Sequence, residues 1–217
     1  MNTNDRKTLF GDLDVDVEFD APIGAMTWFG IGGRADALVR PRSEDAMAAL
    51  SARCASSGTP IHILGKGANL LVHDDGIGGI VVRLDHEAFT RLRFNAEGKV
   101  DRVLAMAGAD LFNSVQEFTR QGLAGFTQMT GIPGTIGGAV RMNAGGIHGC
   151  IGDCIESVTC LDQRGERLIY DRQQLEFSYR HCNLPEHLVL SAVLKLEPED
   201  PVQLRSRVKD IFASKKA

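Results

Sequence analysis

The chain has 217 residues, of which 43% are apolar and 24% are charged, as in ordinary globular proteins. This length is enough for one domain or two small ones with a buried core. The net charge of −4 excludes a general attraction for nucleic acid or for an anionic membrane surface. Apolar runs such as residues 80–82 are too short to span a bilayer, and residues 1–7 are polar. We therefore expect a cytoplasmic protein without nucleic-acid or membrane partners.

Five cysteines, an odd number at irregular spacing, argue against a disulfide framework. His148, Cys150 and Cys154 lie close together in the sequence. However, no fourth ligand stands at a finger-like spacing, and the paired Cys-x-x-Cys of a zinc site is missing. We expect no metal, and reduced cysteines that pack as small apolar side chains.

The predicted elements follow an acidic, aperiodic stretch at residues 1–24, which we interpret as a tail or a loosely docked arm. Apolar residues at helical or alternating spacing then predict a series of elements. In chain order these are a strand at 35–39, a helix at 44–56, strands at 60–64, 70–72 and 79–84, a helix at 110–121, strands at 157–162, 166–170 and 188–196, and a helix at 202–212.

A first glycine-rich loop, Gly65-Lys66-Gly67-Ala68-Asn69, follows the strand at 60–64. It resembles the start of the G-x-G-x-x-G dinucleotide fingerprint, but Leu70 replaces the last glycine and no helix is predicted after it. Two interpretations stay open. The free amides of the loop form a concave nest for an anion, to which Asn69 adds a side-chain amide, or the loop is a tight turn between strands.

A second loop spreads four glycines over nine positions, from Gly131 to Ala139. Such a run is a poor helix interior, because each glycine costs about 1 kcal/mol relative to alanine. Ile132, Ile136 and Val140 are too apolar for a mobile surface loop. We therefore interpret this loop as a wall that a ligand's ring or phosphate approaches closely.

Tyr179-Arg180 is a third candidate. A guanidinium beside a phenol suits a carboxylate or an enolate, because the first binds it bidentately and the second donates one hydrogen bond. On spacing alone, a surface ion pair with an aromatic lid is the simpler interpretation.

With these residues the chain resembles the family of UDP-N-acetylenolpyruvoylglucosamine reductases, flavoenzymes of peptidoglycan precursor synthesis. The similarity runs from about Thr27 to the C-terminus and is most like the shorter, type II branch. It rests on five motifs in the family's order, namely TWFGIGG at 27–33, LGKGANLL at 64–71, GIPGTIGGA at 131–139, MNAG at 142–145 and YR at 179–180.

The resemblance implies an α+β fold, a two-lobed FAD-binding domain of the vanillyl-alcohol-oxidase/PCMH type. It places one lobe at 25–86, the other at 87–200 and the start of a truncated C-terminal region at 201–217. It implies that the FAD pyrophosphate is bound by Gly65, Lys66, Gly67, Ala68, Asn69 and Leu70. The residues expected to flank the flavin or otherwise bind the cofactor are Ile132, Pro133, Gly134, Thr135, Gly137, Gly138, Ala139 and Asn143.

The same resemblance implies that NADPH reduces the flavin, which then reduces the enolpyruvyl group of a UDP-sugar. Arg180 matches the arginine that stabilises the developing enolate, and Tyr179 the tyrosine that positions substrate. Family members also carry a proton-donating serine and an assisting glutamate in a C-terminal domain, which this sequence lacks; Ser214 is not in the serine's motif. Arg141, His181 and Cys182 also depart from the residues more usual in the family. The alternatives are an incomplete or non-catalytic FAD-binding module, and a missing domain supplied by a separate chain.

Overall fold

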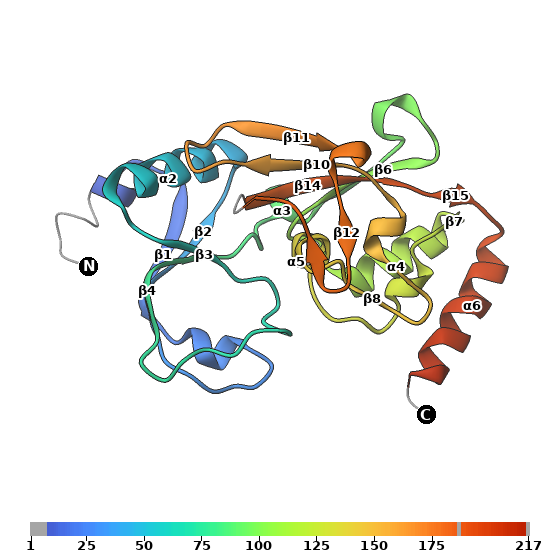
Figure 1. Ribbon diagram of the computed structural model, residues 1–217, viewed down its shortest axis with the longest axis horizontal. Helices are drawn as coiled ribbons and strands as arrows, with labels where there is room; N and C mark the ends of the chain where they lie inside the picture. The colour runs from blue at the N-terminus through green and yellow to red at the C-terminus, as the bar shows by residue number, and fades with distance from the viewer. Residues whose placement is uncertain (1–7, 186–187, 216–217) are drawn as a thin grey trace. The chain divides into compact units, whose positions relative to one another are not determined.

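A computed structural model describes residues 8–185 and 188–215, which form two compact units (Figure 1). The first unit consists of the described part of Met1–Phe89 with Cys160–Leu168 and Leu188. The second consists of Thr90–Thr159 and the described parts of Ile169–Pro185 and Val189–Ala217.

The first unit is built on a four-stranded sheet with the order β1-β2-β4-β3. Its strands are β1 (Val15–Ala21), β2 (Ala35–Pro41), β3 (Ile61–Ile63) and β4 (Ile77–Val82). β1 runs antiparallel to β2, whereas β2 and β3 both run parallel to β4. The chain crosses from β2 to β3 through α2 (Glu44–Ser57), which begins at the Ser43 cap and ends at Gly58 in the left-handed conformation. A 3₁₀ turn, η1 (Ile23–Met26), follows β1.

The tail predicted over residues 1–24 is wrong for β1, while residues 1–7 lie outside the described residues. Val17 of β1 pairs with Val39 of the sheet's second strand, and Leu9 and Phe10 before it are buried. Apolar and acidic residues alternate along this strand, so the sequence did carry a strand signal, and the acidic side chains are exposed. Asp16, for example, accepts a 2.6 Å hydrogen bond from Arg42.

The segment after the first glycine loop also differs from expectation. Residues 70–73 form no strand, and regular structure resumes only at β4. No helix occurs between residues 61 and 76 either. The dinucleotide fingerprint, which needs a helix directly after its glycines, is therefore rejected.

The second unit is built on a five-stranded sheet with the order β11-β10-β14-β6-β5. Its strands are β5 (Leu92–Phe94), β6 (Arg102–Met106), β10 (Ile155–Leu161), β11 (Arg167–Asp171) and β14 (Leu188–Lys195). Short strand pairs are β7 (Leu123–Ala124) with β15 (Glu197–Pro198), β8 (Gly145–Gly146) with β9 (Gly149–Cys150), and β12 (Phe177–Ser178) with β13 (His181–Cys182). The 3₁₀ turns are η2 (Ala96–Gly98), η3 (Thr127–Met129), η4 (Ile151–Asp153) and η5 (Arg172–Gln174).

The helices in the described part of this unit are α3 (Glu87–Thr90, which the unit holds in part), α4 (Leu111–Arg120), α5 (Ile136–Arg141) and α6 (Pro201–Ser214). In Figure 1 the red α6 lies alongside the green α4, with which it is in contact. Lys215, just after α6, donates a 2.6 Å hydrogen bond to the carbonyl of Thr130. Phe118 of α4 is buried in the core. The centre of its ring lies 5.0 Å from the centre of the Phe126 ring, in an edge-on contact. None of the helices in the described residues is long and apolar enough to cross a membrane.

The predicted helices at 44–56, 110–121 and 202–212 are confirmed as α2, α4 and α6, with ends shifted by a few residues. The strands predicted at 35–39, 60–64, 79–84, 157–162, 166–170 and 188–196 are confirmed in the same way. The second glycine loop, expected to avoid helix, instead contains α5. Its Thr135 cap and the burial of Ile136, Ala139 and Val140 outweigh the helix cost of its two glycines.

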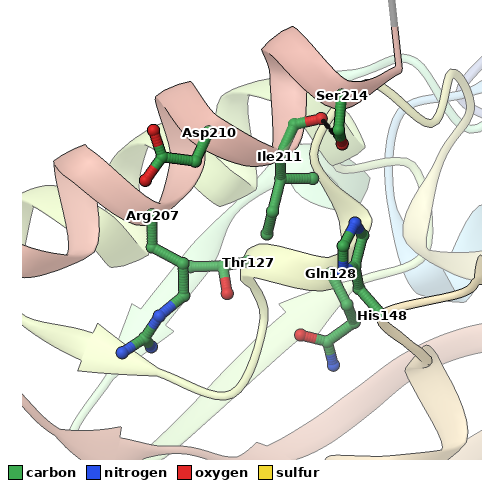
Figure 2. A pocket seen from close by; sticks show the side chains of 7 residues that line it. All are labelled: Thr127, Gln128, His148, Arg207, Asp210, Ile211 and Ser214. Atoms are coloured by element: carbon green, nitrogen blue, oxygen red, sulfur yellow. Dashed lines mark hydrogen bonds between the residues drawn. The ribbon is translucent and has the colours of Figure 1, made fainter.

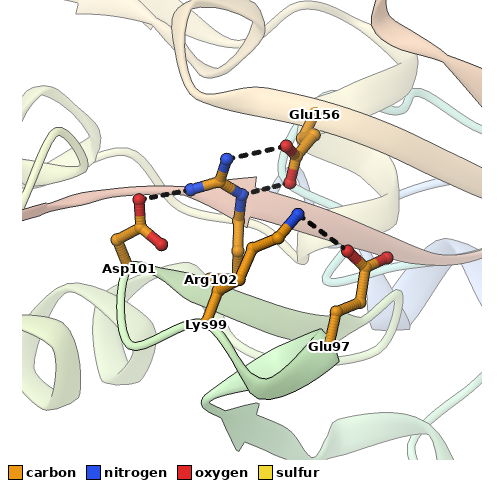
Figure 3. Close-up of polar contacts among 5 residues, drawn as sticks. All are labelled: Glu97, Lys99, Asp101, Arg102 and Glu156. Carbon is orange, nitrogen blue, oxygen red and sulfur yellow. Dashed lines mark hydrogen bonds and ion pairs between the residues drawn. The ribbon is translucent and has the colours of Figure 1, made fainter.

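A cluster of charged groups connects two strands of this sheet across β14 (Figure 3). Arg102 of β6, only 7% exposed, donates two hydrogen bonds to Glu156 of β10 and a third to its neighbour Asp101. Lys99 and Glu97 form a separate pair 3.3 Å apart. The guanidinium of Arg102 lowers the pKa of Glu156, and the carboxylate in turn raises the pKa of Arg102.

Candidate functional site

The first glycine loop packs closely against the segment that precedes it in the sequence. The amide of Trp28 donates a 3.1 Å hydrogen bond to the carbonyl of Gly67. Gly67 is buried and has a φ of +66°, and a Cβ there would stand 2.6 Å from the carbonyl oxygen of Met26. Only glycine therefore fits this position.

The same loop presents backbone donors. Within the part of the chain that the structure describes, no backbone or side-chain group accepts a hydrogen bond from the amides of Gly67, Ala68 or Asn69. A buried amide such as that of Gly67 normally has a partner, and consecutive free amides form anion-binding nests. These amides fit the diphosphate of a dinucleotide.

Exposed apolar side chains accompany this loop, a feature that the sequence analysis missed. Trp28 and Leu71 are each 67% exposed. Others in the same two segments are Phe29, Ile31, Ile63 and Leu70. The signal in the sequence was the motif at 27–33, which contains Trp28, Phe29 and Ile31. A concentration of large exposed apolar side chains is typical of a binding surface.

The second glycine loop has one buried face and one open face. The amides of Ile136 and Gly137 donate to the carbonyls of Ala109 and Ala107 at 2.9 and 2.8 Å. Gly137 is required, because a Cβ there would lie 2.9 Å from the Cβ of Ala107. Gly138 is exposed, and a Cβ there would meet only the Thr135 hydroxyl at 3.5 Å. The backbone at Gly138 is thus open to the close approach of a flat ring.

Tyr179 and Arg180 form the two-residue turn of the β12–β13 hairpin. Tyr179 is 91% exposed, and the guanidinium carbon of Arg180 lies 5.9 Å from the centre of its ring. Arg180 has a φ of +57°, an uncommon conformation for a residue other than glycine. Such strain is found where the surrounding structure fixes a functional side chain.

The structure brings this hairpin together with the segment that follows α5. The side-chain amide of Asn143 donates a 2.9 Å hydrogen bond to the carbonyl of Ser178. Arg141 donates to the carbonyls of Leu184 and Pro185, both at 2.7 Å. The second glycine loop and the Tyr179-Arg180 turn are therefore parts of one assembly within the second unit, whereas the first glycine loop belongs to the other unit.

The cysteines near this assembly are not poised as nucleophiles. Burial raises the pKa of Cys150, Cys182 and, to about 12, Cys154. A protonated thiol is a poor nucleophile at neutral pH.

A cavity of about 480 Å³ lies elsewhere in the second unit, between α6, η3 and the β8–β9 turn (Figure 2). Seven residues line it: Thr127, Gln128, His148, Arg207, Asp210, Ile211 and Ser214. None of them is a predicted site residue, and Arg207 is already held by two hydrogen bonds to Glu199. The predicted site residues lie outside this cavity, on the two glycine loops, in or next to α5, and in the β12–β13 turn.

Comparison with known proteins identifies the family of this chain. The model of the FAD binding domain family matches residues 35–170, which include both glycine loops. The UDP-N-acetylenolpyruvoylglucosamine reductase of Geobacter metallireducens is 36% identical to this chain. The match covers 96% of this chain and 68% of that reductase. This chain belongs to the UDP-N-acetylenolpyruvoylglucosamine reductase family.

Other members agree. The reductase of Moorella thermoacetica is 37% identical over 90% of this chain and 63% of its own length. The crystal structure of the reductase from Thermus caldophilus is 30% identical, with a TM-score of 0.79 over 93% of this chain and 69% of that one. The chain thus spans less than two thirds of the length of several reductases that it matches, including that of Moorella thermoacetica.

More distant structures share the fold alone. A glucooligosaccharide oxidase from Acremonium strictum aligns with 89% of this chain at a TM-score of 0.65 and 16% identity. A cholesterol oxidase from Brevibacterium sterolicum aligns with 85% of the chain at the same TM-score. The predicted fold class, an α+β FAD-binding domain of the vanillyl-alcohol-oxidase/PCMH type, is confirmed.

Proposed function

We propose that this protein binds FAD and reduces UDP-N-acetylenolpyruvoylglucosamine to UDP-N-acetylmuramate with NADPH as reductant. Membership of the reductase family carries this proposal. By the same argument the protein acts in the cytoplasm, in peptidoglycan precursor synthesis, and its small-molecule partners are NADPH and the UDP-sugar.

The cofactor is proposed to contact each unit through its glycine loop. The free amides of Gly67, Ala68 and Asn69 are suited to the diphosphate, and the other residues of the loop at 65–70 are proposed to line the same site, with Lys66 adding a positive charge. The open backbone at 132–139 is suited to the flavin ring, since Gly138 lets it approach closely. The lobes at 25–86 and 87–200 are likewise proposals, and each contains one of the two glycine loops.

The chemistry that bound FAD would supply is hydride transfer. The hydride comes from NADPH and is delivered to the enolpyruvyl carbon. The role of Arg180 is electrostatic. Its guanidinium binds the carboxylate of the enolpyruvyl group and stabilises the negative charge that grows there as the enolate forms. Tyr179 donates a hydrogen bond that orients the same group. Both side chains are exposed on a turn and so accessible to a substrate.

Flavin binding and turnover test the proposal separately. The purified protein should be yellow, and its flavin absorbance should bleach when NADPH is added. A colourless protein that takes up no FAD would contradict the cofactor assignment. Addition of the enolpyruvyl substrate to the reduced protein should restore the oxidised spectrum.

Arg180→Ala should leave FAD bound and reducible but lower turnover about 100- to 1000-fold, the usual effect of losing one charge-stabilising donor. Arg164→Ala is the matched control, because Arg164 is also an exposed arginine, in the turn between β10 and β11. Normal turnover in Arg180→Ala would refute the assigned role.

The alternative is an FAD-binding module that is not catalytic by itself. It is favoured by the coverage of the relatives, since the chain spans only 63% of the Moorella reductase. It predicts FAD binding without re-oxidation by the substrate. Recovery of turnover on adding a separate chain, expressed from the C-terminal part of that reductase, would support an incomplete module. Full turnover by the 217-residue chain alone would exclude it.

A further inference from the structure

We infer that Asn143 is a positioning residue for Arg180, fixing the β12–β13 turn onto the end of the second glycine loop. This inference rests on the proposed function, because it concerns how the turn is presented to the substrate. It changes the role expected for Asn143, whose side chain is directed to the protein's own hairpin.

Both ends of the Asn143 side chain are used by the protein. Its Nδ2 donates to the Ser178 carbonyl at 2.9 Å, and its Oδ1 accepts from the Gly152 amide at 3.1 Å. The backbone of Asn143 has a φ of +40°, a conformation in which asparagine is enriched. The side chain therefore bridges η4 and β12, two segments that follow it in the sequence.

The β12–β13 hairpin packs against Gly152. A Cβ at this residue would lie 2.6 Å from Cγ of Phe177, so the aromatic ring of β12 rests directly on its backbone. The guanidinium of Arg172 covers that ring at 5.4 Å from its centre. The base of the hairpin is thus held by packing.

The turn itself has fewer supports. β12 and β13 contribute only two residue pairs, and a two-stranded hairpin of this size is marginal by itself. Tyr179 is almost fully exposed, and the strained φ of Arg180 needs surroundings that enforce it. The carbonyl that Asn143 binds belongs to Ser178, the last residue before the turn. Asn143 consequently determines the direction in which the chain enters Tyr179-Arg180.

Two variants separate the two hydrogen bonds. Asn143→Asp keeps an oxygen for the Gly152 amide but sets a carboxylate oxygen against the Ser178 carbonyl. Asn143→Gly accepts the positive φ without strain and removes both bonds. Asn95→Asp and Asn95→Gly are matched controls, because Asn95 has a φ of +56° and caps η2 without a side-chain hydrogen bond.

The FAD-loaded protein is titrated with UDP-N-acetylenolpyruvoylglucosamine, and the change in flavin absorbance gives the substrate affinity. Both Asn143 variants should bind substrate about tenfold more weakly, the usual effect of losing one such bond, with FAD affinity unchanged. Amide hydrogen exchange should become faster at residues 178–182, in Asn143→Asp as well as in Asn143→Gly. The Asn95 variants should match the wild-type protein in all three measurements.

Loss of FAD affinity in Asn143→Asp would overturn the inference, because it would indicate that the Asn143 side chain binds the cofactor. Unchanged exchange at 178–182 in both variants would overturn it as well. Failure of the proposed function gives a different result. In that case the wild-type protein shows no spectral response to substrate, while the exchange measurement still decides whether Asn143 fixes the turn.

Discussion

Gly67 and Gly58 show at the residue scale what the first glycine loop requires. Both have a φ of +66°. A Cβ at Gly58, the residue that ends α2, would meet nothing within 4 Å. A Cβ at Gly67 would overlap the backbone of Met26 and Thr27. A side chain at either position would therefore carry the same conformational cost of a positive φ. The two positions differ in the space that is available for a Cβ.

This pair gives a controlled prediction. Gly58→Ala should lower the free energy of unfolding by about 1 kcal/mol, the cost of placing alanine at positive φ. Gly67→Ala should cost about 2 kcal/mol more, because the loop must move away from residues 26–27. FAD affinity should fall only in Gly67→Ala. Chemical denaturation followed by circular dichroism measures the first effect, and equal losses in both variants would contradict the close packing seen at Gly67.

At the scale of elements, the ion pair between Arg102 and Glu156 connects β6 to β10 across the strand between them. The arginine is buried, so removal of Glu156 leaves its charge less well compensated, with Asp101 still beside it. The helix-surface pair of Glu117 with Arg120 has the same chemistry, and it also lowers the pKa of its carboxylate. Its arginine is exposed, and exposed pairs contribute little.

Glu156→Gln should therefore lower the free energy of unfolding by about 1–3 kcal/mol at neutral pH. Because the folded pKa of Glu156 is lower than the unfolded value, its contribution is complete above the unfolded pKa and disappears as pH falls through the folded pKa. The difference between wild type and Glu156→Gln should accordingly shrink in acid. Glu117→Gln is the control, with a loss below 1 kcal/mol. Urea denaturation at pH 7 and at pH 3 measures these differences, and a gap that widens in acid would contradict this assignment.

The elements also show what the sequence could and could not predict. α2, α4 and α6 were predictable because each carries a buried apolar stripe at helical spacing. β1 was predictable as well, because apolar and acidic residues alternate strictly over residues 15–20. The strand predicted at 70–72 was wrong because Leu70 and Leu71 are exposed, and composition alone cannot distinguish an exposed binding residue from a core residue. α5 was missed because tertiary burial overrides the low helix propensity of glycine.

At the scale of the whole molecule, the motifs predicted the family, but the assembly of the site needed the structure. Asn143 and Ser178 are 35 positions apart, and no periodicity relates them. The hydrogen bond that joins them connects the motif at 142–145 to the residue just before the Tyr179-Arg180 turn. The packing of Gly137 against Ala107 and of Gly67 against Met26 likewise became visible only in the structure.

The division of the chain into two units makes the proposed cofactor site testable in halves. ADP contains the diphosphate but no flavin, so at saturating concentration it should slow amide exchange only at residues 65–70. Riboflavin contains the ring but no diphosphate and should protect only residues 132–139. FAD should protect both segments and raise the melting temperature more than either fragment, since tethering makes the second contact intramolecular. Gly67→Ala should abolish the protection by ADP and leave that by riboflavin. Protection of both loops by ADP alone would show that the second loop does not bind the flavin ring. It would assign both glycine loops to phosphate binding.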